Sequence, residues 1–185
     1  RAKQKGKNQY KCFDEQMKQT ALNTHNEEQA LARAIHNKEI VLYYQPQFDI
    51  KLGQIVGAEA LVRWNHPERG LVFPNEFIPL AEATGHIIEL GHHVIREAFT
   101  YAKRRQDLNL PPIIIHVNLS SVQVADPTLL PLVKGLIQDY GIPGHYIGFE
   151  ITESMVLEDM ELAKHVLNRL KDLGICIAID DFGTG

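Results

Sequence analysis

Short apolar runs typical of buried strands alternate along the chain with longer stretches of helical periodicity. The sequence predicts strands at 40–45, 55–64, 113–118, 146–150 and 175–180. It predicts helices from Asn26 onward and at 74–83, 88–108, 128–140 and 157–173. A hairpin followed by alternating strands and helices favours an α/β fold, a TIM-like (β/α) barrel with an antiparallel first strand.

Capping and turn residues predict where these elements begin and end. Asn26 and Ser120 have side chains suited to helix N-caps, and Gly141 is suited to close the helix at 128–140. Pro46 lacks the N–H that a paired strand needs, so we expect it to stop the first strand. The turn-like stretch at 51–54 would then join this strand to its hairpin partner.

The number of strands bears on whether the barrel is complete. About five strands are predicted, whereas a closed barrel of this kind has eight. A last strand without a partner leaves an open apolar edge that invites association. We therefore expect only the N-terminal part of a barrel, in a chain that is cut short or that another copy or chain closes.

Residues 1–26 differ from the rest of the chain because they are polar and short of hydrophobic periodicity. Basic residues cluster at their head: Arg1, Lys3, Lys5, Lys7 and Lys11. We expect 1–26 to be a linker and tail arriving from an upstream domain, and 27–185 to be the folded domain.

The composition is that of a soluble globular protein, with 44% hydrophobic and 23% charged residues. The formal net charge of −4 argues against a nucleic-acid polymer as partner. No apolar stretch approaches the roughly 20 residues of a membrane span, so we expect no membrane contact within this segment. The two cysteines stand in unlike contexts, which fits the reducing cytoplasm or the cytoplasmic part of a membrane-anchored parent.

Three of the strand-like runs end on an oxygen-bearing side chain: Asn118, Glu150 and Asp180. They follow one another at intervals of about 30 residues, the length of one strand–helix–strand unit. Parallel strands that repeat in this way bring their C-terminal ends to one side of the sheet, where such folds hold their active sites. We therefore expect an amide and several carboxylates, including Asp181, to converge there.

The second strand of the hairpin adds another acidic residue. Glu59, Leu61 and Arg63 point to one face of this strand, and its apolar neighbours point to the other. Taken alone, the segment also fits a surface strand with a salt bridge. The acidic residues at the other strand ends favour a shared site, in which the donors of Arg63 would suit a phosphate.

A shared site for Glu59, Glu150 and Asp180 requires a compensating charge. Two like charges about 4 Å apart repel by about 4 kcal/mol even at an effective dielectric constant of about 20. Ligands that are all oxygen favour Mg²⁺, Mn²⁺ or Ca²⁺ over Zn²⁺. Asp181 is placed to hold a second ion, and two neighbouring ions are a common means of phosphodiester hydrolysis. Glu153 is either a further ligand or an acceptor of hydrogen bonds from the loop at Asp181.

The histidines are weaker candidates for site residues than the carboxylates. His86, His92 and His93 fall on or near a helical segment, where a solvated face is the simplest interpretation. His116 shares a strand face with Asn118 and is expected to be a hydrogen-bonded core residue rather than a ligand.

The motifs along the chain resemble, in order, those of a known family. Segment 57–64, which contains Glu59-Ala60-Leu61, resembles the signature that names the EAL domain, the bacterial cyclic di-GMP phosphodiesterase. Supporting motifs extend the resemblance from about residue 27 to the end: Tyr44-Gln45-Pro46, Phe77-Ile78-Pro79-Leu80-Ala81-Glu82, Val117-Asn118-Leu119-Ser120, Phe149-Glu150-Ile151-Thr152-Glu153-Ser154 and Asp180-Asp181-Phe182-Gly183-Thr184-Gly185.

The resemblance implies a barrel that hydrolyses cyclic di-GMP to linear pGpG with water activated by Mg²⁺ or Mn²⁺. The implied metal ligands are Glu59, Asn118, Glu150, Asp180 and, for the second ion, Asp181, of which Glu59, Asp180 and Asp181 are the catalytic residues. The implied substrate contacts are Gln45, Leu61 and Arg63. Glu153 would anchor the loop beginning at Asp181, which in the family couples dimer contacts to the metal site, so a homodimer is implied as well.

The resemblance also bears on the flanking regions. Residues 1–8 resemble the closing segment of a GGDEF domain, the usual upstream neighbour of EAL, with a simple charged linker as the alternative. The family pattern includes a catalytic lysine and a glutamate often given the base role, and neither has a counterpart among these 185 residues. The resemblance thus implies a phosphodiesterase parent and no measurable hydrolysis by this chain alone. The alternatives are a non-catalytic EAL module that binds cyclic di-GMP or a protein, and an unrelated metal-dependent barrel enzyme.

Overall fold

The computed structural model describes residues 15–152 and 160–180 and is organised around one sheet of six strands. The strands are β1 (Ile40–Asp49), β2 (Gln54–His66), β3 (Gly70–Val72), β4 (Ile114–Asn118), β5 (Ile147–Thr152) and β6 (Cys176–Asp180). Their order is β1-β2-β4-β5-β6, and the short strand β3 pairs with β2 beside this path.

The direction of the strands confirms the predicted α/β class. β1 and β2 form an antiparallel hairpin, whereas β2, β4, β5 and β6 pair in parallel. Within the residues described, β1 and β6 lie at the two edges of an open sheet. The arrangement is therefore that of an incomplete TIM-like barrel with an antiparallel first strand.

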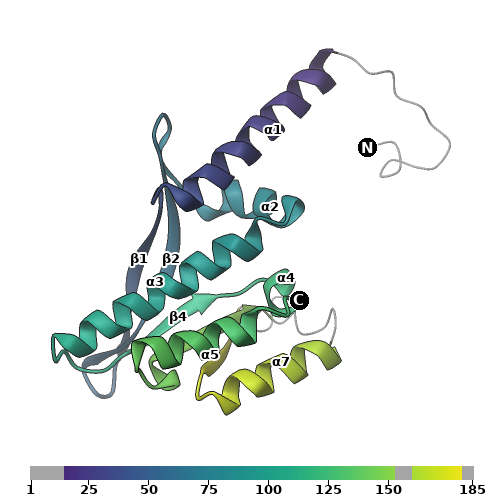
Figure 1. Cartoon of the computed structure of the whole chain (residues 1–185). Coiled ribbons are helices and arrows are strands. Elements are labelled where there is room, and N and C mark those ends of the chain that lie inside the picture. The colour runs from purple at the N-terminus through teal and green to yellow at the C-terminus, as the bar shows by residue number, and fades with distance from the viewer. Residues whose placement is uncertain (1–14, 153–159, 181–185) are drawn as a thin grey trace.

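Helices cover one face of this sheet (Figure 1). The described helices are α1 (Glu15–His36), α2 (Pro74–Thr84), α3 (Ile87–Asp107), α4 (Ser121–Val124), α5 (Leu129–Tyr140) and α7 (Met160–Asp172), with the 3₁₀ turn η2 (Gly144–Tyr146) before β5. Of these, α1 packs on α2 and α3 and extends beyond the sheet. α3 packs beside α5, and α5 packs beside α7. The described helices contain no segment both long and apolar enough to cross a membrane.

The core lies between these helices and the sheet because every second strand residue is apolar and faces them. Ile115 and Val117 of β4 are buried there, as are Ile147, Phe149 and Ile151 of β5. The intervening residues of the same strands point to the opposite face, which is where the predicted site residues lie.

Two predicted strand ends are wrong. β1 continues through Pro46, which pairs opposite Ala58, and reaches Asp49. Proline is tolerated because β1 is an edge strand, where the missing N–H does not remove a hydrogen bond between strands. β5 continues past Glu150 to Thr152, so Glu150 lies inside the strand rather than at its end.

Among the helices, only the first departs strongly from prediction. α1 begins at Glu15, so Asn26 lies within it and is no N-cap. The predicted caps at Ser120 and Gly141 are confirmed, with Gly141 in the left-handed conformation at φ 59°. The predicted start of the last helix at 157 lies outside the described residues.

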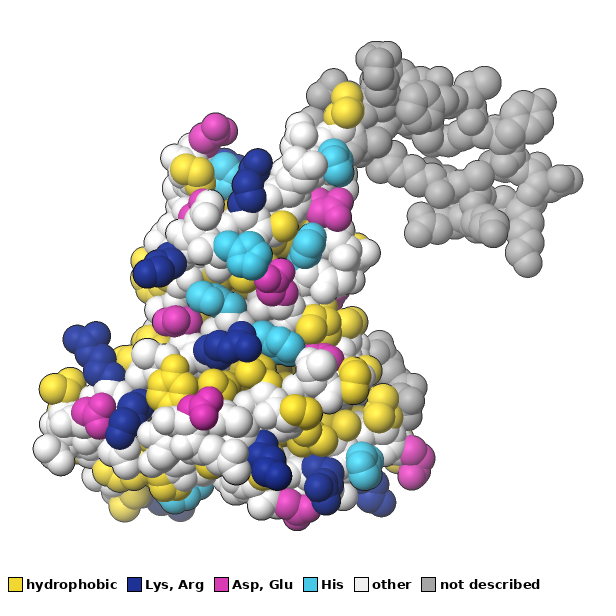
Figure 2. All heavy atoms as spheres, in the orientation of Figure 1, with side chains coloured by type: hydrophobic (Ala, Val, Ile, Leu, Met, Phe, Trp, Pro, Cys, Tyr) yellow, Lys and Arg dark blue, Asp and Glu magenta, His cyan; other side chains and the backbone are white. Residues whose placement is uncertain are grey.

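Histidines gather on the helical face, next to acidic side chains (Figure 2). His36 lies 3.2 Å from Glu89, and His86 lies 3.9 Å from Glu28, so both pairs join α1 to the region of α3. His93 contacts the carbonyl of Ile40 through its Nε2. The prediction that His86 and His93 lie on a solvated face is therefore wrong, since both are partly buried and contact a neighbouring element.

Candidate metal and substrate site

The sheet brings the predicted ligands to the face that the helices leave uncovered. Strand pairing sets Glu59 opposite His116, Asn118 opposite Glu150, and Asp180 opposite Thr152. These residues come from four parallel strands whose side chains alternate between the faces. The register places Glu59, Asn118, Glu150 and Asp180 on the same face of the sheet, and that they meet around one shared ion stays a prediction.

Direct contacts join these side chains in pairs. The Asn118 amide Nδ2 donates a hydrogen bond of 2.7 Å to Glu59 Oε1. Glu150 is the buried member, with 9% of its surface exposed. Its Oε1 accepts a hydrogen bond of 3.3 Å from Gln47 Nε2 and lies 3.2 Å from His116 Nδ1.

The carboxylates repel one another. Burial raises the pKa of Glu150, the charge of Glu59 raises it further and that of Asp180 adds a smaller increase, against which the hydrogen bond from Gln47 acts. Burial also lowers the pKa of His116, although the charge of Glu59 opposes this. The site therefore has surplus negative charge that neither Gln47 nor a neutral His116 neutralises.

The donor set fits a hard divalent cation, since carboxylate and amide oxygens are its preferred ligands. The geometry is open, however: across residues 15–152 and 160–180, no three His, Cys, Asp or Glu side chains lie close enough together to ligate one ion. Asp181, the expected ligand of a second ion, and Glu153, the expected loop anchor, lie outside these residues.

Arg63, a predicted substrate contact, is half-buried on β2. Its guanidinium carbon lies 4.9 Å from the ring centre of Phe73 and 6.0 Å from that of Tyr43. Its Nη1 donates to the carbonyl of Val62 at 2.8 Å. No salt bridge joins Arg63 to Glu59 among the described side chains, so the interpretation as a simple surface ion pair loses its support.

The other two predicted substrate contacts flank the acidic residues. Gln45 is exposed on β1, directly opposite Glu59. Leu61 lines a cavity of about 620 Å³, a size that suits a small-molecule ligand. Other residues lining this cavity include Ile78, Glu82, Asn118, Ser120 and Thr152.

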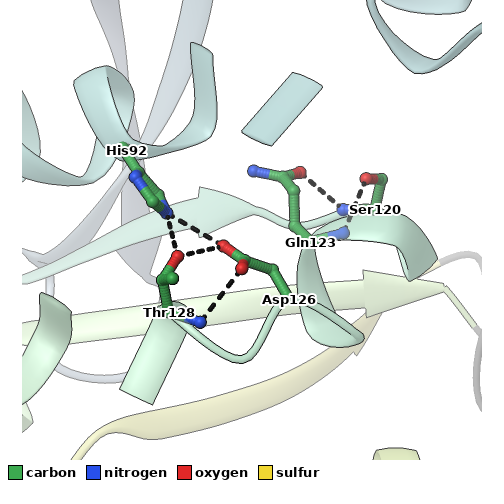
Figure 3. A network of polar contacts seen from close by, with 5 residues as sticks. All are labelled: His92, Ser120, Gln123, Asp126 and Thr128. Atoms are coloured by element: carbon green, nitrogen blue, oxygen red, sulfur yellow. Dashed lines mark hydrogen bonds and ion pairs between the residues drawn. The ribbon is translucent and has the colours of Figure 1, made fainter. Parts of the chain in front are cut away.

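A polar network fastens the segment after Asn118 to α3 (Figure 3). His92 Nε2 lies 3.0 Å from Asp126 Oδ2 and 3.1 Å from Thr128 Oγ1, which itself donates to Asp126 at 2.6 Å. Burial acts to raise the pKa of Asp126, but the hydrogen bonds from Thr128 and His92 outweigh it and hold that pKa below its ordinary value.

The same segment begins with a capping box. Ser120 Oγ accepts from the backbone N–H of Gln123, and the Gln123 side chain accepts from the N–H of Ser120. Gly91 of α3 leaves room for this glutamine, because a Cβ at Gly91 would lie 1.8 Å from Gln123 Nε2. Asn118 is thus followed directly by an anchored segment.

Two side chains that contact Glu150, those of Gln47 and His116, are not among the site residues predicted from the sequence. Gln47 stands two positions after Gln45 and therefore shares its strand face, which is the signal that could have drawn attention to it. His116 was expected to be a hydrogen-bonded core residue, yet its Nδ1 is buried without an aligned hydrogen-bond partner. The nearest acidic group to this nitrogen is the carboxylate of Glu150.

Comparison with known sequences identifies relatives along the whole chain. The EAL domain family model matches residues 28–185. MucR of Pseudomonas aeruginosa, a bifunctional diguanylate cyclase/cyclic di-GMP phosphodiesterase, is 36% identical over 189 residues, which cover 100% of this chain and 27% of MucR. The signalling protein YkoW of Bacillus subtilis is 39% identical over 184 residues, which cover 100% of this chain and 23% of YkoW. The chain thus spans about a quarter of the length of these relatives.

Solved structures share the fold. The MucR phosphodiesterase in complex with c-di-GMP superposes with a TM-score of 0.82 and 36% identity, covering 86% of this chain and 65% of that one. The EAL enzyme Bd1971, with cAMP and cyclic di-GMP bound, gives 0.82 and 34% identity over 90% of this chain and 46% of that one. A Xanthomonas citri FimX EAL domain, at 20% identity, supports the fold alone, with a TM-score of 0.82 over 91% of this chain and 65% of that one. Family model, sequence relatives and solved structures agree, and this chain belongs to the EAL domain family, homologous to cyclic di-GMP phosphodiesterases.

Proposed function

We propose that this chain is the N-terminal, ligand-bearing part of a metal-dependent cyclic di-GMP phosphodiesterase in a bacterial signalling regulator. One observation carries the proposal: Glu59, Asn118, Glu150 and Asp180 project from parallel strands onto one face, and the first two are hydrogen-bonded to each other. The raised pKa of Glu150 supports it, because burial and the charges of Glu59 and Asp180 disfavour the ionised carboxylate unless a cation compensates. Oxygen donors of this kind suit Mg²⁺ or Mn²⁺.

The residues of the site take separate roles in this proposal. Glu59, Asn118, Glu150 and Asp180 would hold one ion and Asp181 a second, with Glu59, Asp180 and Asp181 closest to the chemistry. Divalent ions held by these residues would supply a water of lowered pKa and would stabilise the leaving oxygen.

Substrate recognition is assigned to the neighbouring strands. Arg63 would donate to a phosphate oxygen, because its planar fork of N–H donors matches that group. Leu61 would offer apolar contact from the cavity wall, and Gln45 would add an amide contact beside Glu59. Glu153 would anchor the loop that begins at Asp181.

The remaining assignments concern the parent protein. This chain covers 65% of the MucR phosphodiesterase structure. We therefore propose that further catalytic groups lie outside these 185 residues and that the chain alone does not hydrolyse cyclic di-GMP. We also propose residues 1–26 as the end of an upstream GGDEF domain with its linker, 27–185 as the EAL portion, a homodimeric assembly and a cytoplasmic location.

The test compares the parent protein with this chain. Chromatographic detection of linear pGpG should show hydrolysis by the parent with Mg²⁺ or Mn²⁺, none after Glu59→Ala, and none by the 185-residue chain. A parent that binds cyclic di-GMP without cleaving it would instead be the non-catalytic module. That alternative draws support from the absence of a closed ligand cluster within 15–152 and 160–180. A parent that neither binds nor cleaves cyclic di-GMP would overturn both.

A further inference from the structure

Two nitrogen-bearing side chains converge on one oxygen of the buried Glu150. Gln47 Nε2 lies 3.3 Å from Glu150 Oε1, and His116 Nδ1 lies 3.2 Å from the same atom. They reach it from different strands, Gln47 from β1 and His116 from β4. Neither contact uses Oε2.

Glycines give both side chains the space they occupy. A Cβ at Gly57 would lie 2.5 Å from Gln47 Oε1, and a Cβ at Gly148 would lie 2.7 Å from His116 Nδ1. Gly57 is the strand partner of Gln47, and Gly148 is that of His116. The backbone thus keeps two positions without side chains where Gln47 and His116 cross the sheet toward Glu150.

Among the described residues, Glu150 is the acidic group that lies within hydrogen-bonding distance of His116 Nδ1. This nitrogen is buried and has no aligned hydrogen-bond partner among the described residues, although the carboxylate oxygen is at hydrogen-bonding distance. Burying a polar nitrogen without a hydrogen-bond partner costs free energy. The position of this nitrogen beside Glu150 therefore needs a functional explanation.

We propose that Gln47 and His116 are positioning residues that hold Oε1 of Glu150 from two sides and so turn Oε2 toward a divalent cation. This inference rests on the proposed function, because it assigns Glu150 as a metal ligand. Groups that orient a ligating carboxylate are worth about 10–100-fold in metal affinity. The competing explanation is that both side chains only fill space above the glycines.

The experiment measures Mn²⁺ affinity of the 185-residue chain by calorimetry and by electron paramagnetic resonance, together with the melting temperature. Gln47→Met keeps the length of the side chain and removes its N–H donor. His116→Leu keeps a branched side chain in place of the imidazole and removes both ring nitrogens. We expect each to weaken Mn²⁺ binding by about 10-fold or more. His116→Asn retains an N–H near the place of Nδ1 and should restore most of the affinity.

Matched controls and the contrary outcomes separate positioning from packing. Gln138→Met on α5 and His165→Leu on α7 change exposed residues and should leave Mn²⁺ affinity unchanged. Wild-type affinity in Gln47→Met and His116→Leu would overturn the inference, as would a His116→Asn variant as weak as His116→Leu. If Glu59→Gln still abolishes binding in that case, the proposed metal site stands. A wild-type chain that binds no Mn²⁺ would overturn the inference and the proposed ligand set, while the phosphodiesterase activity of the parent is tested separately by pGpG detection.

Discussion

The carboxylate of Glu150 illustrates how one residue can be suited to a ligand and unfavourable for the fold. Its folded-state pKa lies above the ordinary value of 4.5 because of burial and the charges of Glu59 and Asp180. A raised acid pKa means that the folded chain binds the proton more tightly than the unfolded chain does. Stability therefore falls as the pH rises from about 4.5 through the raised pKa, and is constant below this window.

We predict that Glu150→Gln raises the melting temperature of the metal-free chain at about pH 8, and that the difference shrinks as the pH falls below about 4.5, where the wild-type carboxyl becomes protonated in both states. Thermal unfolding followed by circular dichroism at several pH values measures this. Glu68→Gln, at an exposed turn residue, is the control and should show no such trend. An equal difference at every pH would contradict the charge explanation.

A second prediction at the residue scale concerns Arg63, whose guanidinium lies near the rings of Phe73 and Tyr43, and these contacts restrict its orientation. Hydrogen bonds to charged groups contribute about 1.5–3 kcal/mol, so Arg63→Ala should weaken cyclic di-GMP binding by roughly 10- to 150-fold. Calorimetry with the parent protein measures the change. Arg96→Ala, at an exposed position on α3, should bind as the wild type does. Equal losses in both variants would mean that overall charge, not a specific contact, is responsible.

At the level of elements, the short turn η2 leads into β5 and packs against the start of β6. A Cβ at Gly144 would lie 2.1 Å from the backbone carbonyl oxygen of Leu173, and a backbone atom cannot move aside as a side chain can. We predict that Gly144→Ala destabilises the chain by about 1–3 kcal/mol. Gly135→Ala on α5, where no heavy atom lies within 4 Å of the new Cβ, should instead be neutral or stabilising by up to about 1 kcal/mol. Urea unfolding of both variants measures the contrast, and equal effects would refute it.

Element boundaries show where local patterns carry information and where they do not. α2, α3, α5 and the caps at Ser120 and Gly141 follow prediction because propensity, periodicity and capping are local properties. Pro46 was misjudged because its effect depends on whether the strand is at an edge of the sheet, which sequence alone does not show. The start of α1 was misplaced because residues 15–26 lack the hydrophobic periodicity that usually marks a helix.

For the whole molecule, a cation that binds only the folded chain should stabilise it by mass action. At a Mn²⁺ concentration about 100 times Kd, one site adds about 2.7 kcal/mol. For a chain of this length, that corresponds to a rise in melting temperature of roughly 5–10 °C. The rise should vanish with EDTA and in Glu59→Gln. A melting temperature that does not change when Mn²⁺ is added would argue against the proposed ligand set. So would a rise with Mn²⁺ that is equally large in the wild type and in Glu59→Gln.

The sequence alone was enough to predict the α/β class, the antiparallel first strand and the placement of Glu59, Asn118, Glu150 and Asp180 on the same face of the sheet. These follow from side-chain alternation, from the spacing of strand–helix units and from motif residues, all of which can be read along the chain. The contacts of Gln47 and His116 with Glu150, and the space that Gly57 and Gly148 leave for them, required the folded structure. They depend on which strands become neighbours and in what register, and that is settled by packing between residues far apart in the chain.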